Sequence, residues 1–132
     1  MDKVMKYDIR EDPFLRKNGI YLEEDRRDYT RFTAMITEEQ ANPYGVAHGG
    51  FLYMMSDIAA GIAADSDGRS YVTYNASYTF IKGAPIGTRV YAEAWPVSRR
   101  HRTCVVKAEI YDDQRELLTE GTYIMYKISD HH

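Results

Sequence analysis

The chain has 132 residues, and its 17 Lys and Arg against 20 Asp and Glu give a net charge of −3 at neutral pH. This length is that of a single domain, the charge offers no basic surface for nucleic acid, and the longest apolar run, which contains Asp57, is too short to span a membrane. Because the single cysteine, Cys104, cannot form an internal disulfide and the first residues lack the apolar segment of a signal peptide, we expect a cytoplasmic protein that binds neither nucleic acid nor membrane.

The N-terminal residues 1–19 are charged and weakly patterned, which predicts an arm or a short helix. After them the pattern predicts a hairpin, a loop rich in turn formers, one apolar helix and four long strands joined by short turns. The expected ranges are strands 20–26 and 29–37, helix 50–65, and strands 71–82, 88–97, 103–112 and 117–128. Such consecutive strands form an antiparallel meander, so we expect an α+β fold with one domain at residues 20–128 and a tail at 129–132.

The predicted helix has two sides that we expect to be covered. At 100° per residue its large apolar side chains share one side, which we expect to face the core: Phe51, Met54, Met55, Ile58 and Ile62. The opposite side carries small residues and Asp57 in place of the Lys, Glu and Arg of a solvated face. Since one helix covers only one face of the sheet, this second side predicts a homo-oligomer, at least a two-fold dimer.

The strand at 71–82 shows a clean alternation of two sets of side chains. The apolar and aromatic set is Val72, Tyr74, Ala76, Tyr78 and Phe80. Thr73 belongs to the polar set on the other face, and an unbroken strand keeps the two sets on opposite sides.

Asp57 and the sequence His48-Gly49-Gly50 are the candidates for chemistry. A carboxylate on a covered helix face is costly unless it is paired or hydrogen-bonded, so its presence needs a reason. Glycines at a helix start leave backbone N–H groups unpaired and unobstructed, and such a terminus can stabilise a developing oxyanion. From the residues alone the alternatives stay open: Asp57 is equally a surface carboxylate that water reaches, and Gly49-Gly50 is equally a plain loop pair.

The spacing of these residues resembles that of the phenylacetyl-CoA thioesterase group of acyl-CoA thioesterases, which have the hotdog fold. The matching residues follow the pattern Asn-x-x-Gly-x-x-His-Gly-Gly, with the acid nine residues after the His: Asn42, Gly45, His48, Gly49, Gly50 and Asp57. Residues 72–87, a strand followed by a turn with Pro and Gly, also resemble the family. The resemblance covers about residues 20–127 and implies an antiparallel sheet wrapped around one central apolar helix.

This resemblance implies an enzyme that hydrolyses acyl-CoA thioesters at dimer interfaces, with no metal and no cofactor. Asp57 of one subunit is expected to act as general base or nucleophile, and the Gly49 N–H of the other to polarise the thioester carbonyl. Asn42 is expected to orient the attacking water or the thioester, Thr73 to position the water, and His48 to support the loop. These roles follow from the family pattern and not from spacing alone.

The phosphates of CoA require cations, and the one dense basic cluster lies at the turn after strand 88–97. The residues expected to contact the substrate are Gly50, Tyr71, Lys82, Arg99, Arg100 and Arg102. The alternatives are that the cluster is a solvated hairpin tip and that the tyrosine packs at the dimer interface. We expect at least a homodimer, with a homotetramer as the fuller assembly.

Two other functions remain open at this point. A hotdog dehydratase or hydratase uses a His and an acid as a pair, whereas here the His-Gly-Gly sequence runs directly into the helix. A non-catalytic acyl-CoA-binding protein keeps the fold without turnover, although such regulators usually carry a DNA-binding segment and this chain has no spare length for one. A crotonyl-type substrate that loses or gains water would favour the first, and tight acyl-CoA binding without hydrolysis would favour the second.

Overall fold

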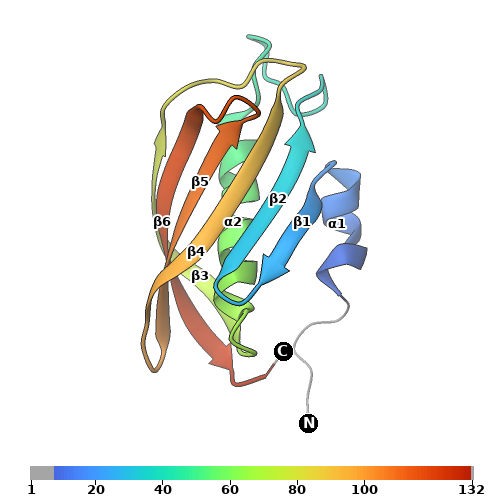
Figure 1. Cartoon of the computed structure of the whole chain (residues 1–132). Helices are drawn as coiled ribbons and strands as arrows, with labels where there is room; N and C mark the ends of the chain where they lie inside the picture. Colours follow the sequence, from blue (N-terminus) through green and yellow to red (C-terminus); the bar gives the residue numbers. More distant parts are fainter. Residues whose placement is uncertain (1–7, 132) are drawn as a thin grey trace.

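A six-stranded antiparallel sheet curves around one long helix in the computed structural model, which describes residues 8–131 (Figure 1). In chain order the elements are η1 (Ile9–Glu11), α1 (Pro13–Lys17), β1 (Tyr21–Arg26), β2 (Tyr29–Met35), α2 (Gly49–Asp65), β3 (Ser70–Phe80), β4 (Arg89–Arg99), β5 (Thr103–Asp112) and β6 (Leu117–Ser129). The strand order is β1-β2-β4-β5-β6-β3, so β1 and β3 are the two edges of the sheet. This is the α+β arrangement that the sequence predicts, with each long element close to its expected range.

The N-terminal arm begins, in the described part, with η1 and α1. Residues 1–7 of the expected arm and residue 132 of the expected tail lie outside the described residues. Asp12 caps α1 through a hydrogen bond from Phe14 N–H to its Oδ1 at 2.9 Å, and Pro13 occupies the first turn, where its missing N–H costs nothing. Leu15 is buried, so α1 packs on the body beside β1 (Figure 1).

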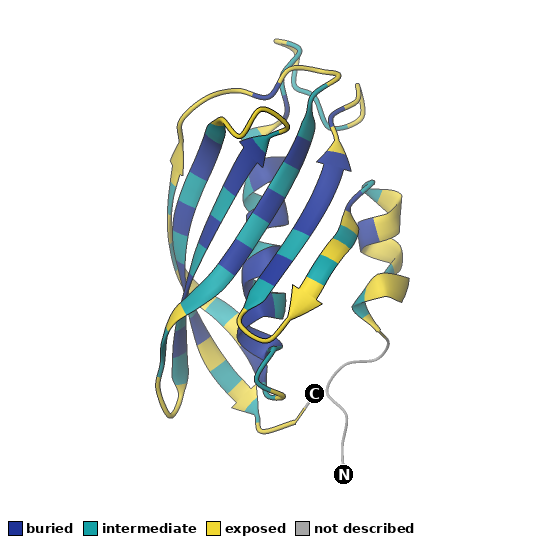
Figure 2. Cartoon of the chain, viewed as in Figure 1, coloured by how far each residue is buried: buried dark blue, intermediate teal, exposed yellow. Residues whose placement is uncertain are grey.

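The side of α2 that faces the sheet is not the one predicted. Small or slender side chains are buried against the sheet: Leu52, Met55, Ser56, Ala59, Ala60 and Ala63. Of the expected core side, Phe51 and Met55 are buried but Met54, Ile58 and Ile62 are only partly buried, so the prediction is wrong by roughly a third of a turn at 100° per residue. The reason is close approach: three buried residues of the sheet are alanines, Ala92, Ala94 and Ala108, and small side chains on both layers allow a short distance between helix and sheet. Figure 2 shows α2 coloured largely as buried behind the sheet.

A β-bulge interrupts the alternation of β3. Thr73 pairs with Met125 of β6 and Asn75 with the adjacent Ile124, so Tyr74 is the extra residue. The bulge turns Thr73 toward α2, whereas Val72 and Tyr74 are 46% and 63% exposed. The prediction that these two share a face with Tyr78 is therefore wrong, because a bulge shifts every side chain on one side of it to the other face.

Candidate active site

Asp57 and Thr73 form a hydrogen-bonded pair on the outer side of α2. The Thr73 hydroxyl donates to Asp57 Oδ1 at 2.5 Å, and it also lies 3.2 Å from the Met125 sulfur. The bulge at Tyr74 aims the threonine, and the middle of the helix presents the aspartate. Since the hydroxyl occupies one carboxylate oxygen, the other can accept a proton from a water molecule.

The pair lies in an open groove of about 430 Å³ along the C-terminal half of α2. Its apolar lining comes from Ile9, Ile58, Gly61, Ile62, Tyr71, Val72 and Met125, and its polar lining from Asp57, Asp65 and Thr73. An apolar wall with a few convergent polar groups is typical of a small-molecule site. The groove therefore leaves the Asp57 carboxylate at a surface that a small molecule can reach.

A second carboxylate, Asp65, lies at the far end of the groove. It accepts a hydrogen bond from the Tyr71 N–H at 3.0 Å, and burial raises the pKa of Asp65 to about 7. The Tyr71 hydroxyl donates to Asp67 at 2.7 Å, and burial together with this bond raises the pKa of Tyr71 to about 12. The hydroxyl of Tyr71 is thus held by the protein, and the residue is only 7% exposed, so just a small part of it lines the groove.

The first turn of α2 carries two unpaired backbone amides. The N–H groups of Gly49 and Gly50 have no acceptor within the described part of the chain, and His48, at the N-cap, makes no side-chain capping bond. The His48 N–H donates to Gln40 O at 2.8 Å, which fixes the loop at the helix start, and the imidazole is exposed. Free donors at the positive end of the helix dipole favour a developing negative charge at this point.

Asn42 shapes the loop that leads into α2. Its Oδ1 accepts hydrogen bonds from Tyr44 N–H at 2.9 Å and Val46 N–H at 3.3 Å. Gly45 in this turn has φ +81, a conformation that side-chain-bearing residues rarely adopt. Because the amide oxygen is used, only Nδ2 of Asn42 is left for the expected role of orienting a water or thioester.

One chain alone does not bring Asp57 and Gly49 together. The two residues are eight positions apart on a helix that rises 1.5 Å per residue, a separation of about 12 Å along the axis. A reacting carbonyl must lie about 3 Å from its oxyanion donor and close to the base. The two expected catalytic elements of a single chain therefore cannot serve the same thioester.

Arg99 caps the end of α2. Its guanidinium donates to Ala63 O at 3.1 Å and Ala64 O at 3.0 Å, and it is paired with Asp67 at 2.7 Å and Asp28 at 2.8 Å. All three guanidinium nitrogens are engaged and the side chain is only 17% exposed. Arg99 thus stabilises the negative end of the helix, and no donor is left for the phosphate expected from the sequence.

The other expected cations lie at opposite ends of the molecule. Lys82 follows β3 near the start of α2, and its Nζ is 2.7 Å from Glu116. Arg100 and Arg102 are exposed in the turn between β4 and β5, at the end where α2 finishes (Figure 1). No single phosphate group can therefore contact all three side chains of one chain.

Sequence reasoning did not find several residues of this region. Met125 contacts Thr73, but in the sequence it is one apolar residue among many in an alternating strand. Tyr78 makes buried hydrogen bonds with Ser56 Oγ at 2.7 Å and Thr119 Oγ1 at 2.6 Å. The only signal was the unusual number of tyrosines, 12 in the chain, which indicates half-buried rings with a polar tip but not their partners.

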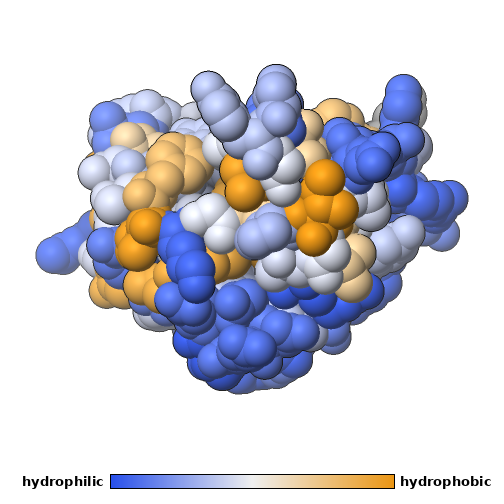
Figure 3. All heavy atoms as spheres, turned by 90° about the horizontal axis from the view of Figure 1, so that it is seen from above, coloured by the Kyte–Doolittle hydropathy of each residue, from blue (hydrophilic) through white to orange (hydrophobic). Residues whose placement is uncertain are grey.

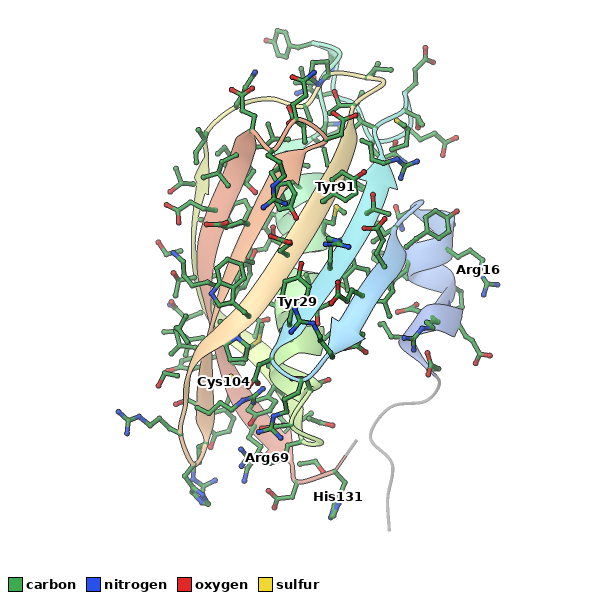
Figure 4. All side chains as sticks on the ribbon, viewed as in Figure 1. Arg16, Tyr29, Arg69, Tyr91, Cys104 and His131 are labelled. Atoms are coloured by element: carbon green, nitrogen blue, oxygen red, sulfur yellow. The ribbon has the colours of Figure 1, made fainter. Side chains whose placement is uncertain are left out.

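Cys104 is buried on the inner face of the sheet, where burial raises the pKa of its thiol, as expected of a core residue (Figure 4). Within residues 8–131, no group of three or more His, Cys, Asp or Glu is placed to hold a metal ion. In the same residues, no helix has the length and apolar character needed to cross a membrane.

Residues 44–119, more than half of the chain, match the family model of the Thioesterase superfamily. The chain belongs to this superfamily. A protein of Archaeoglobus fulgidus named "Putative esterase" is 22% identical over 130 residues, which are 98% of this chain and 84% of that protein. Membership supports thioester hydrolysis in general terms.

Two solved structures are similar to this superfamily member in fold. The PaaI protein of the phenylacetic acid degradation operon of E. coli has a TM-score of 0.87 and 22% identity, over 90% of this chain and 86% of that one. A hypothetical thioesterase of Streptococcus pneumoniae, solved with coenzyme A, has a TM-score of 0.82 and 23% identity, over 86% and 91%. The expected hotdog fold is confirmed.

Proposed function

We propose that the protein hydrolyses an acyl-CoA thioester to a carboxylic acid and free CoA, with Asp57 as the reactive carboxylate. The observation that carries the proposal is the Asp57–Thr73 hydrogen bond of 2.5 Å inside an apolar groove. Thioester hydrolysis needs a proton acceptor, a water and an oxyanion donor, and no metal. The pair supplies the first, and the threonine hydroxyl supplies a fixed point from which a water can be oriented.

The pneumococcal thioesterase supports this choice of residues. Forms of it have been solved with one threonine or one aspartate replaced by alanine, and these two residues are 16 apart in its chain. Asp57 and Thr73 are also 16 apart. Its structure with coenzyme A, and that of a Streptococcus mutans protein bound to acetyl CoA, support an acyl-CoA as the substrate here.

We also propose that two copies of the chain build each site. β3 is an edge strand with an unpaired side, and antiparallel pairing of two β3 strands through their middle would place the half that carries Thr73 in one copy beside the half that carries Phe80 in the other. Phe80 packs on Gly49, since a Cβ on that glycine would lie 3.1 Å from the ring. The Asp57–Thr73 pair of one copy would then lie beside the helix start of the other, which resolves the separation of about 12 Å within one chain.

The reaction then follows from the positions of these groups. Asp57 takes a proton from a water molecule while the water oxygen bonds to the thioester carbon. The carbonyl electron pair moves to the carbonyl oxygen, where the Gly49 N–H stabilises the negative charge. The electron pair returns, the C–S bond breaks, and the Asp57 proton passes to the departing CoA sulfur. If Asp57 is instead the nucleophile, its oxygen bonds to the thioester carbon, the C–S bond breaks to release CoA, and water then cleaves the mixed anhydride. Water that attacks the Asp57 carboxyl carbon leaves ¹⁸O in Asp57, so ¹⁸O found in Asp57 after a single turnover in H₂¹⁸O would show this second route.

The remaining expected residues have supporting roles in this proposal. Asn42 Nδ2 and Gly50 N–H would assist at the helix start, and His48 would keep its loop role. Arg100 and Arg102 would meet the phosphates of CoA, whereas Lys82 is held by Glu116 at 2.7 Å. We propose that two such dimers form a homotetramer and that the protein acts in the cytoplasm.

The test is thiol release from short, medium, long and aromatic acyl-CoAs by the wild type and by Asp57→Asn. We expect Asp57→Asn to lose at least ~10²-fold in kcat with the dimer intact, the scale of lost general acid–base catalysis. Asp113→Asn is the matched control, because Asp113 lies exposed in the turn after β5 and outside the groove. Tight acyl-CoA binding with no thiol release from the wild type would contradict hydrolysis and favour a binding protein.

A further inference from the structure

Four aromatic rings cluster beside the start of α2. Tyr53 comes from the helix, Tyr78 and Phe80 from β3, and Tyr123 from β6. Ring centroids are 5.1 Å apart for Tyr53 and Tyr78, 5.0 Å for Tyr78 and Phe80, and 5.7 Å for Tyr53 and Tyr123. Figure 3 looks down on this end of the molecule and shows hydrophobic surface open among polar groups.

Tyr78 is the fixed centre of the cluster. Its hydroxyl bonds with Ser56 Oγ at 2.7 Å, Thr119 Oγ1 at 2.6 Å and Leu52 O at 3.2 Å. Its ring lies over Gly121 of β6, where an added Cβ would be 2.5 Å from the ring carbon Cδ1. The hydroxyl of Tyr78 is held by three polar contacts, and its ring packs directly on a glycine. These contacts fix the orientation of the Tyr78 side chain.

Phe80 is held by Tyr78 but is itself open to solvent. It meets Tyr78 edge-on and lies against the helix start at Gly49, yet 55% of it is exposed in a single chain, at the β3 edge where we propose that a second copy pairs. An exposed phenyl ring contributes little to core stability, because most of its apolar surface stays in water. Phe80 is held in place by Tyr78 and lies next to the unpaired Gly49 N–H, so its ring is well placed to contact a ligand.

We infer that Phe80 forms a wall of the subsite for the acyl group and that Tyr78 is the positioning residue that holds this wall in place. The inference rests on the proposed function, since the Gly49 N–H marks where the thioester carbonyl binds. The acyl group fits this surface better than the nucleotide does, because the cluster carries no cation and the Tyr78 and Tyr123 hydroxyls are turned to protein atoms. Lys82, two residues on, is already paired with Glu116. The Phe80 wall therefore selects acyl groups by their apolar size.

The test is the ratio of kcat/KM for a bulky apolar acyl-CoA to that for acetyl-CoA. We expect Phe80→Ala to change this ratio by ~10-fold or more, the scale of a lost apolar contact in a specificity pocket, and Phe80→Leu to restore part of it. Phe14→Ala is the matched control, because Phe14 is also a half-exposed phenylalanine, at 53%, but lies on α1. The control should keep the wild-type ratio.

An equal loss on every acyl-CoA would overturn the inference, since it would place Phe80 against the CoA part or in a purely structural role. Dissociation constants of the same two acyl-CoAs in the Asp57→Asn background give the ratio without turnover. Failure of hydrolysis therefore does not obscure the result: an inactive wild type whose binding ratio still depends on Phe80 contradicts only the enzyme proposal.

Tyr78→Phe tests the positioning role. This variant keeps the ring and removes the hydroxyl, so it loses stability because Ser56 and Thr119 are left buried without their partner. At a temperature where the variant is fully folded, we expect its acyl ratio to move a few-fold in the direction of Phe80→Ala. A lowered Tm with an unchanged ratio would show that Tyr78 only stabilises the fold.

Discussion

Replacing Gly49 with proline removes one candidate oxyanion donor while keeping the helix start. Proline lacks the N–H and is favoured in the first turn of a helix, and Gly49 is the first residue of α2. The residue before a proline must be extended, and His48 already has φ −55 and ψ 136. The backbone can therefore accept Gly49→Pro without rearrangement.

The size of the effect follows from the contacts of this amide. Loss of one oxyanion donor typically lowers kcat by ~10²–10³-fold. Proline also adds a Cβ, which would lie 3.1 Å from Phe80 Cε1, so the ring must shift by a few tenths of an ångström. Gly49→Ala adds the same Cβ and keeps the N–H, which makes it the matched control for that steric part.

The assay is thiol release at saturating acyl-CoA, with circular dichroism and gel filtration to show that both variants keep fold and assembly. We expect kcat of Gly49→Pro to fall ~10²-fold or more below that of Gly49→Ala. If the two variants are equally active, the amide has no part in catalysis and the oxyanion role of the helix start is refuted.

Two further predictions concern stability. The folded-state pKa of Asp65, about 7, is raised above its ordinary 3.8, so the unfolded chain releases a proton that the folded chain keeps, and stability falls as pH rises from about 4 to about 7. Asp65→Asn keeps an acceptor for the Tyr71 N–H. In urea unfolding we expect it to raise the free energy of unfolding by up to about 4 kcal/mol at pH 8 and to change it little at pH 4. Equal effects at both pH values would contradict the burial cost. Arg99→Lys cannot reach both α2 carbonyls and both carboxylates, so we expect a loss of about 1–3 kcal/mol in the same experiment, and an unchanged midpoint would refute the capping role.

The long elements were predictable because their signals are local. Strand alternation, the apolar run of α2 and the turn residues between them follow from period and composition, and they give the α+β fold. The spacing from His48 to Asp57 placed the two halves of the candidate site at the start and in the middle of one helix. The structure adds the groove around Asp57 and the bond to Thr73, while the catalytic roles of these residues stay predictions.

The features that the sequence did not predict depend on contacts between distant elements. The helix turns its alanines to the sheet because Ala92 and Ala108 leave room for close approach, and a hydrophobic pattern that favours large side chains points to the wrong side. The bulge at Tyr74 depends on how β3 pairs with β6. The sequence predicted Arg99 as a phosphate ligand. Its hydrogen bonds to the end of α2 were not predictable, because they depend on β4 and the helix lying side by side in the fold.

Mixed dimers test most directly whether one site is built from two chains. Asp57→Asn and Gly49→Pro are each expected to be nearly inactive as homodimers. Mixing them after unfolding and refolding gives heterodimers in which one of the two sites has both Asp57 and Gly49 intact. We expect about a quarter of the wild-type activity to return in a random mixture, since half of the dimers are mixed and each has one intact site of two. No recovery from a mixture shown to contain heterodimers would contradict the shared site, because a site within one chain is then always missing one of its groups.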